Sequence, residues 1–341
     1  LLLENRGTPD NPDFRSEPMP FPPNDPVQSS GYNAPTLTPW GEDGHIAMFL
    51  GVLGGAYNAN QTLADNFYFY SQDNAGNFSL QTKRFLSTLD TGNESIVATG
   101  DLNGNGKKDL LLTNKIDPGE RNSSLVYVFE NRGSETSPEL HMTGTLDLPD
   151  AYHYAPALAD LDGDGLDDLL LGRWRGGVAY YRNTGDGFEI VEETLLELPR
   201  GSNATPALAD LDGDGDFDLL LGSSGGRVFY FKNEGTPTEP DFQLVEDAFT
   251  GVEVQHRSVP AFYDIDGDGD QDLFLGSKVE GILFFRNTGM PGNPEFTKEP
   301  LPISVEVTQF SAPHFVDLHG DGTPEFLSGN KEGGVFYFSV E

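Results

Sequence analysis

The chain has 341 residues, of which 55 are acidic and 20 are basic, so its formal net charge at pH 7 is −35. A charge of this sign argues against binding to nucleic-acid phosphates and to anionic membrane surfaces, and we expect no nucleic-acid partner. Cysteine is absent, which excludes disulfides, thiolate metal sites and a cysteine nucleophile. With glycine at 41 positions and proline at 24, the composition indicates a globular, turn-rich protein.

The sequence contains no long apolar segment. Because no run of about 18 apolar residues occurs, we expect no direct insertion into a membrane. The chain opens with Leu1-Leu2-Leu3-Glu4, and no signal-peptide pattern precedes it. We therefore expect a soluble chain that is a processed or truncated product.

An internal repeat organises the chain. The phrase Ala-Pro-Ala-Leu-Ala-Asp-Leu-Asp-Gly-Asp-Gly at 155–165 returns with little change at 205–215 and 259–269. Weaker copies also occur, so that acidic starts stand at 101, 160, 210, 264 and 317. An eroded sixth copy at 34–44 keeps only one of the aspartates, Asp43. These copies divide the chain into units at about 34–94, 95–153, 154–203, 204–257, 258–310 and 311–341.

Each unit carries the same order of strand signals after its acidic loop. In the unit 204–257 these are an apolar run at 219–222, an aromatic strand at 228–231, an Asn-x-Gly turn at 233–235 and a more polar strand at 242–245. Turns of this type are typical of hairpins. Four short strands in about fifty residues, repeated about six times without helical periodicity, predict an all-β fold, a β-propeller of four-stranded blades.

The number of blades follows from a tally of the expected strands. The five complete units, the three-stranded C-terminal unit and two strands within residues 1–20 give a total that lies closer to six blades than to seven. We expect a single propeller domain over residues 1–341. In this domain the unit 311–341 is closed by residues 1–33, which pair beside the strand Val335-Phe336-Tyr337-Phe338.

The acidic loop has the composition of a site for a hard cation. In the pattern Asp160-x-Asp162-x-Asp164-Gly-x-x-Asp168, side chains at positions 1, 3, 5 and 9 and the carbonyl at position 7 offer oxygens that can converge on one ion. Calcium takes about six to eight oxygens in flexible geometry, whereas magnesium needs a stricter octahedron. The loop is not an EF-hand, because it lies between strands and has Leu171 where an EF-hand has its bidentate Glu. The predicted metal ligands are Asp101, Asn103, Asn105, Asp109, Asp160, Asp162, Asp164, Asp168, Asp210, Asp212, Asp214, Asp218, Asp264, Asp266, Asp268, Asp272, Asp317, Asp321 and Glu325.

Two of the five loops depart from the pattern. The first has Asn103 and Asn105 in place of aspartates, and the last has His319 at position 3, which leaves the fifth site open. We expect about three to five calcium ions, which act as structural staples in a chain without disulfides. Because free calcium is high outside cells, such sites indicate an extracellular, cell-surface or periplasmic location.

The chain resembles the FG-GAP/VCBS repeat family of calcium-binding β-propellers, which includes the head of integrin α subunits and the integrin-like fungal lectins. The resemblance covers nearly the whole chain and rests on three full Asp-x-Asp-Gly-Asp-Gly-x-x-Asp loops and two variants. The Asn-x-Gly-Thr-Pro segments at 5–9 and 233–237 look like those of secreted bacterial members. The resemblance implies a secreted or surface-displayed protein, commonly of seven blades, that serves in cell adhesion or carbohydrate binding or stands beside an enzyme.

Basic and aromatic residues gather in the connections that should emerge opposite the acidic loops. We expect this face to recognise an anionic or polyhydroxylated ligand, such as an acidic polysaccharide, or a surface protein. Aromatic rings would stack on the ligand, and arginines would donate in pairs. In the alternative, these residues only balance charge in solvated turns. The candidate ligand-binding residues are Arg173, Trp174, Arg175, Tyr152, Tyr154 and Arg257.

Two other functions stay open. A polysaccharide-active, lyase-like enzyme would use His153, His256, Arg257 and Tyr154, but these residues have no recognisable catalytic spacing, so no catalytic residue is assigned. The second alternative is a structural subunit of an extracellular assembly. Incomplete repeats at both ends of the chain would suit self-assembly by strand exchange.

Overall fold

The computed structural model describes residues 3, 5–15, 17–20, 33–39, 45–52, 67–82, 91–117, 123–134, 136–245, 249, 251–290, 293–305, 307, 310–331 and 333–339. All regular secondary structure among these residues is β-strand, which confirms the all-β prediction. None of the described segments is therefore a helix that could cross a bilayer. The chain forms two compact units, Leu1–Asp90 with Pro118–Glu120, and Thr91–Asp117 with Arg121–Glu341.

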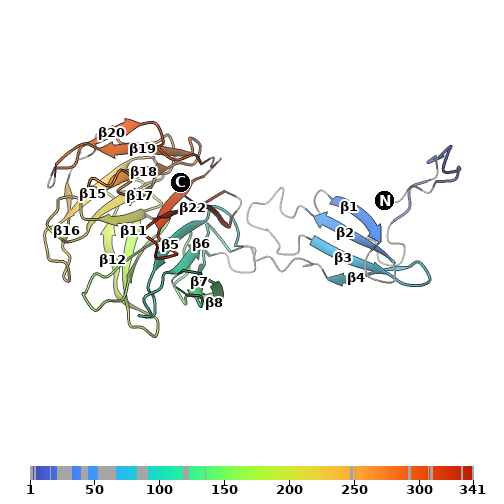
Figure 1. Cartoon of the computed structure of the whole chain (residues 1–341), viewed down its shortest axis with the longest axis horizontal. Coiled ribbons are helices and arrows are strands. Elements are labelled where there is room, and N and C mark those ends of the chain that lie inside the picture. Colours follow the sequence, from blue (N-terminus) through green and yellow to red (C-terminus); the bar gives the residue numbers. More distant parts are fainter. Residues whose placement is uncertain are drawn as a thin grey trace. The chain divides into compact units, whose positions relative to one another are not determined.

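The first unit contains one antiparallel sheet in the order β1-β2-β3-β4 (Figure 1). Its strands are β1 (Asn33–Pro39), β2 (Ile46–Val52), β3 (Phe67–Gln72) and β4 (Phe78–Thr82). Met48, Tyr70 and Phe78 form the buried core of this sheet. The eroded unit 34–94 thus keeps four strands although most of its acidic residues are lost.

The second unit contains five antiparallel sheets in which consecutive strands are neighbours. Four of these sheets have four strands and the last has three. The strands are β5 (Ile96–Gly100), β6 (Asp109–Thr113), β7 (Val126–Asn131), β8 (Leu140–Thr145), β9 (Ala155–Ala159), β10 (Asp168–Gly172), β11 (Gly177–Asn183), β12 (Phe188–Glu197), β13 (Thr205–Ala209), β14 (Asp218–Gly222), β15 (Val228–Asn233), β16 (Phe242–Val245), β17 (Val259–Tyr263), β18 (Asp272–Gly276), β19 (Ile282–Asn287), β20 (Phe296–Glu299), β21 (Ala312–Val316), β22 (Glu325–Gly329) and β23 (Val335–Ser339).

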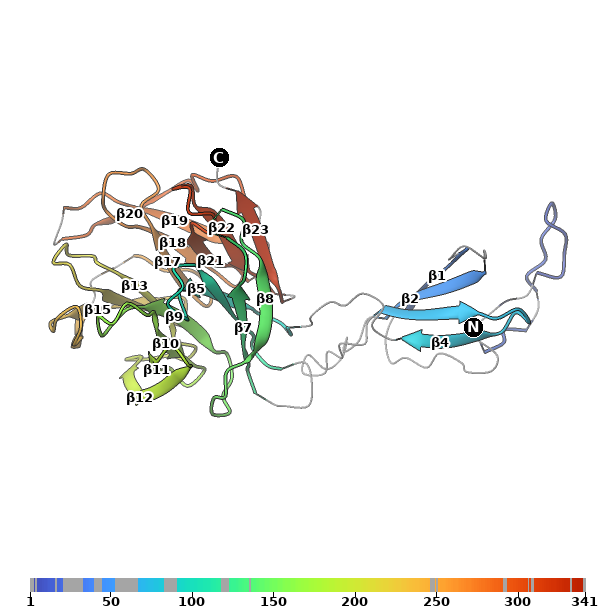
Figure 2. The same cartoon turned by 60° about the horizontal axis from the view of Figure 1, so that its bottom comes forward.

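The first strands of these five sheets form a closed ring. β5, β9, β13, β17 and β21 each contact the next strand of the series, and β21 contacts β5 (Figure 2). At each step the residue two positions before a first strand donates its N–H to a carbonyl in the turn between the second and third strands of the preceding sheet. Glu94 N donates to Lys331 O at 3.0 Å and so joins the last sheet to the first. The ring is therefore closed by the same backbone contact that joins its other neighbours.

The second strand of each ring sheet lies deepest. β6, β10, β14, β18 and β22 are buried along their whole length, which explains why the sequence there is apolar at consecutive positions instead of alternating. Neighbouring sheets share their cores, as where Leu170 and Tyr180 pack with Leu219 and Phe231. The fourth strands β8 and β12 are mostly exposed, in agreement with their polar sequences.

The described residues hold six sheets in total, as the strand tally predicts, and not the seven blades that the resemblance implies. Five of these sheets belong to the ring. The two strands expected within residues 1–20 do not occur among the described residues there. Instead, Asn5 Oδ1 accepts hydrogen bonds from Gly7 N at 2.9 Å and Asp13 N at 2.8 Å. A single domain over 1–341, closed by residues 1–33, stays a prediction, because the two units are described separately.

Candidate functional site

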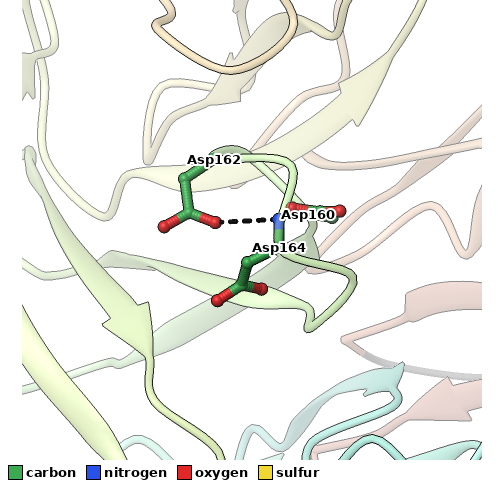
Figure 3. A group of neighbouring side chains, drawn as sticks. All are labelled: Asp160, Asp162 and Asp164. Carbon is green, nitrogen blue, oxygen red and sulfur yellow. Dashed lines mark hydrogen bonds between the residues drawn. The ribbon is translucent and has the colours of Figure 1, made fainter.

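The acidic loops connect the first and second strands of each ring sheet. In the loop that follows β9, Asp160, Asp162 and Asp164 each bring one carboxylate oxygen to within 4.8 Å of the others (Figure 3). The structure repeats this arrangement in the next two loops, at Asp210, Asp212 and Asp214 and at Asp264, Asp266 and Asp268. Within the described part of the chain, these are the three groups of this kind. Positions 1, 3 and 5 of the three full loops thus come together as the sequence predicts.

Backbone hydrogen bonds hold the shape of each full loop. Asp160 accepts from Gly163 N at 2.7 Å and from Gly165 N at 3.0 Å, so its carboxylate closes the turn. Both glycines have left-handed backbone, with φ of 79° and 88°, a region that glycine adopts without the steric cost that other residues have. Asp164 in turn accepts from Leu166 N at 2.9 Å. The loop therefore holds its carboxylates in place through contacts of its own.

Position 9 of the loop anchors the sheet. Asp168 is fully buried, and its carboxylate accepts from Asn183 N at 2.8 Å, from the Tyr180 hydroxyl at 2.9 Å and from Leu161 N at 3.3 Å. Burial raises the pKa of Asp168 above its ordinary value, although these donors lower it in part. The same anchoring contact with the end of the third strand recurs at Asp109, Asp218 and Asp272. Position 9 lies outside the three-carboxylate groups, and its predicted role as a ligand stays a prediction.

A basic residue near the end of the third strand pairs with position 3 in each full loop. Arg182 Nε lies 2.6 Å from Asp162 Oδ2. Lys232 and Arg286 pair with the equivalent aspartates, Asp212 and Asp266. These pairs reduce the negative charge that the loop presents.

The first loop replaces both members of this pair. Asn103 stands at position 3, and the acidic Glu130 occupies the strand position of Arg182. The charge of Glu130 contributes to raising the pKa of Asp109, although burial contributes most. Glu130 is itself paired, because Arg132 Nε lies 2.8 Å from Glu130 Oε2, and Lys107 and Lys108 lie within the loop. The first loop is therefore less negative than the three full loops.

The fifth loop uses its variant residue differently. His319 Nδ1 forms a hydrogen bond with Glu325 Oε1, and Glu325 Oε2 accepts from Leu318 N at 2.8 Å. Asp317 still accepts from Gly322 N at 2.8 Å, as position 1 does in the other loops. The loop thus keeps its shape, while the predicted ligand Glu325 forms a hydrogen bond with His319.

The donor set of the full loops suits a hard divalent cation. The three converging groups are carboxylates, and calcium prefers oxygen ligands held in flexible loops. Three carboxylates at this separation also repel one another, and a bound cation would offset that repulsion. The residues present therefore fit calcium, with positions 1, 3 and 5 as side-chain ligands.

The opposite ends of the strands carry a hollow of about 560 Å³, the aromatic hollow, lined by Asp150, Ala151, Tyr152, Arg173, Trp174, Arg175, Gly177 and Glu197. Tyr152 and Trp174 are 39% and 47% exposed. Their ring centroids lie 5.8 Å apart, and the rings are nearly perpendicular at 86°. Four of the six predicted ligand-binding residues thus line one surface.

The polar groups of the aromatic hollow are partly fixed. Arg173 Nη2 donates to Glu193 O at 2.5 Å and to Thr194 Oγ1 at 3.2 Å, so β12 holds this guanidinium in place. Two arginines and two carboxylates line the hollow, so its formal charges balance. The hollow therefore offers both donors and acceptors without a surplus of either charge.

Tyr154 and Arg257, the other two predicted ligand-binding residues, lie outside the aromatic hollow. Tyr154 is buried in the core, and its hydroxyl donates to Pro149 O. Burial raises its pKa to about 12. Arg257 is also buried, although its neighbour His256 is exposed. The structure therefore separates these two residues from the surface formed by the other four.

Arg257 belongs to a charged group that we call the axial cluster, formed by Glu94, Lys115, His153, Arg257 and Lys278. Arg257 Nη1 donates to Glu94 Oε2 at 2.5 Å and lies 2.8 Å from His153 Nδ1. The Nζ atoms of Lys115 and Lys278 each lie 3.5 Å from Glu94 Oε1. Glu94 is not among the residues predicted from sequence, and it lies 163 residues from Arg257 in the chain. The only available signal was that both residues precede a first strand by two positions.

Comparison with known families and structures gives the following. A family described as FG-GAP-like repeat matches residues 160–221, 210–275 and 264–328, stretches that begin at the three full acidic loops. The chain therefore contains three FG-GAP-like repeats, as its loops predict. A search of the curated proteins finds no match to this sequence.

Solved structures of similar fold come from several proteins. An Agrocybe aegerita lectin that recognises non-reducing terminal N-acetylglucosamine is 16% identical, with a TM-score of 0.38, over 92% of this chain and 81% of the lectin. A Penicillium chrysogenum α-L-arabinanase is 14% identical, with a TM-score of 0.45, over 90% and 92% of the two chains. A mutant of AofleA from Arthrobotrys oligospora is 11% identical, with a TM-score of 0.41, over 81% and 76%.

Proposed function

We propose that the protein is a calcium-stabilised β-propeller that acts outside the cell or at its surface as a binding module for carbohydrate, and so serves in adhesion. The observation that carries the proposal is the aromatic hollow, where two exposed rings meet at 86° beside a guanidinium held by β12. The FG-GAP-like repeats support the same assignment through their acidic loops.

Calcium would bind at the three full acidic loops. Positions 1, 3 and 5 supply the carboxylates, and the fixed backbone of the loop keeps them in place. The ion would supply the positive charge that holds the loop together and would tie the first strand to the second. Several sites of this simple kind suit the high free calcium of an extracellular location.

The chemistry of the aromatic hollow supports a sugar as the ligand. One face of a sugar ring is apolar and packs against an aromatic side chain, and its hydroxyl groups both donate and accept hydrogen bonds. Tyr152 and Trp174 supply the aromatic surface. Arg175 and Glu197, both exposed at the rim, supply a donor and an acceptor.

Replacing Trp174 tests the proposal. The variant Trp174→Ala should have an affinity about tenfold or more lower for an oligosaccharide that the parent protein binds. An aromatic contact in a hollow contributes at least that much to the free energy of binding. A panel of immobilised neutral and acidic glycans, followed by calorimetric titration in calcium, measures the effect. The control is Phe336→Ala, which removes an aromatic side chain of similar exposure from β23. Equal binding by both variants, or no bound glycan, would contradict the proposal.

A further inference from the structure

Five equivalent residues around the ring have unusual backbone. We call them the pre-strand residues, because each lies two positions before a first strand. All five have positive φ although none is glycine, namely Glu94 (51°), His153 (56°), Asn203 (59°), Arg257 (47°) and Phe310 (53°). Left-handed backbone costs free energy in a residue that carries a side chain, and such residues concentrate at functional sites.

Three of the pre-strand residues meet in the axial cluster, where positive charge is in surplus. Glu94 is the single carboxylate, and Arg257, Lys115 and Lys278 contact it with three cationic groups. His153 adds no charge near neutral pH, because burial and these three cations lower its pKa to about 2. The cluster thus carries two positive charges more than negative ones in a chain whose formal net charge is −35.

One buried donor of this cluster lacks a partner among the described residues, as do one acceptor and one donor of residues adjacent to it in sequence, Asn93 Oδ1 and Asn114 Nδ2. Arg257 is 4% exposed, and its Nε makes no hydrogen bond although Nη1 does. Asn114, which directly precedes Lys115, is fully buried, and its Nδ2 is also unpaired. Buried polar groups in folded proteins are almost always hydrogen-bonded. The surplus cations, with the unpaired Arg257 Nε among them, point to an anionic ligand.

We propose that the axial cluster binds the carboxylate of an acidic sugar residue, so that the ligand of the neighbouring aromatic hollow is an acidic glycan. This inference rests on the proposed carbohydrate binding. The two sites adjoin, because His153 of the cluster follows Tyr152 of the hollow, and Trp174 N donates to Tyr152 O at 2.9 Å. The hollow has balanced charges, so the preference for an acidic ligand comes from the cluster.

The members of the cluster have different tasks. Arg257 is held on one side by Glu94 and on the other by the Phe310 ring, whose centroid lies 4.6 Å from the guanidinium carbon. The side chains of Lys115 and Lys278 are 33% and 52% exposed, so their ammonium groups reach the surface. The two lysines therefore contact the ligand carboxylate directly, while Arg257 provides a fixed positive charge beneath them.

The test compares galacturonate oligomers with neutral galactose oligomers by calorimetric titration into the full chain in calcium. The double variant Lys115→Ala/Lys278→Ala should lose about tenfold or more in affinity for the acidic oligomers, since two charge-assisted contacts disappear. Its affinity for the neutral oligomers should stay unchanged. The control Lys298→Ala removes the same charge from the exposed strand β20 and should change neither affinity.

The outcomes distinguish the two proposals. If Trp174→Ala weakens glycan binding and the lysine variant binds acidic oligomers as well as the parent does, carbohydrate binding stands and the axial site is wrong. If no oligomer binds, the carbohydrate proposal fails, and sodium galacturonate alone tests the cluster through the midpoint of thermal unfolding. A rise in this midpoint for the parent that is lost in the lysine variant would support an anion site. The absence of any rise would overturn it.

Discussion

The backbone is regular at both ends of the ring strands, but the side chains are repeated at one end and differ at the other. In the three full acidic loops, equivalent positions hold the same acidic residues, so that Asp160 and Asp210 make matching bonds to the turn glycines. At the pre-strand positions the backbone is equally regular, but the five side chains are all different. Regular backbone with repeated side chains serves the fold and its ions. Regular backbone with different side chains gives one face of the ring distinct local surfaces, which can bind different ligands.

The largest expected effect is the loss of stability when calcium is removed, because calcium would bind at the acidic-loop end alone. For free calcium at about 100 times Kd, each site adds about 2.7 kcal/mol to the free energy of unfolding, so three sites add about 8 kcal/mol. We expect excess EDTA to lower the midpoint of thermal unfolding by about 15 °C or more. Differential scanning calorimetry measures this shift.

Calcium, added back in excess over EDTA, should restore the midpoint, and magnesium should restore much less of it, because the loop oxygens lack strict octahedral geometry. An unchanged midpoint in EDTA would show that the acidic loops hold no stabilising ion. In that case the acidic-loop end of the ring would not be a metal-binding end.

Substituting position 9 should separate anchoring from ion binding. Asp168→Ala leaves Leu161 N, Asn183 N and the Tyr180 hydroxyl without their acceptor in the interior. We expect a loss of about 3 kcal/mol or more in the free energy of unfolding, in EDTA as well as in calcium. Urea unfolding under both conditions measures it.

The matched control is Asp164→Asn, at an exposed position of the same loop. This variant should weaken calcium binding and leave the stability of the metal-free protein within about 0.5 kcal/mol of the parent. If Asp168→Ala is destabilising only in the presence of calcium, position 9 acts as a ligand and the anchoring role is wrong.

The acidic-loop end of the ring could be predicted from sequence more fully than the end that carries the axial cluster. The acidic loops and the buried runs such as Leu169-Leu170-Leu171 could be predicted, because five copies repeat one local pattern. The axial cluster could not, since Glu94 and Arg257 meet only when the ring closes. A strand tally likewise cannot assign the sheet β1–β4 to its own compact unit, because local pattern is the same for every sheet.

The ion pairs at position 3 of the full loops should weaken calcium binding and stabilise the metal-free protein. Arg182→Ala removes the base beside Asp162 and makes its loop more negative by one charge. We expect calcium to bind this loop about threefold more tightly, because an exposed cation at contact distance opposes the ion only weakly. The metal-free protein should become slightly less stable.

Calcium titration of the parent, of Arg182→Ala and of Lys298→Ala tests this expectation. The last variant removes a positive charge from β20 and should leave the affinity unchanged. A weaker affinity in Arg182→Ala would mean that the arginine positions the carboxylate of Asp162 instead of competing with the ion.

The smallest expected effect is a pH dependence of stability that has opposite signs at the two ends. Burial, followed by neighbouring aspartates, raises the pKa of Asp216 and of Asp270 to about 6. These folded-state pKa values exceed the ordinary aspartate value of 3.8, so the folded protein binds more protons between the two values. In EDTA the contribution of these two aspartates to stability should therefore fall as pH rises from about 4 to 6. Relative to the parent, the double variant Asp216→Asn/Asp270→Asn should gain stability as pH rises over this range, which urea unfolding measures.

Over the same range the axial cluster should act in the opposite direction. Burial lowers the pKa of Arg257 to about 10, so it stays charged, whereas burial and the neighbouring cations lower the pKa of His153 from 6.5 to about 2. Between these two values the unfolded protein binds the extra proton, so His153 makes stability rise with pH. His153→Gln should remove this rise, so that stability falls more steeply with pH than in the parent, or rises less. Parallel pH curves for the parent and the double aspartate variant would refute the assignment to Asp216 and Asp270. An unchanged slope in His153→Gln would show that the axial cluster does not hold His153 neutral in the folded protein.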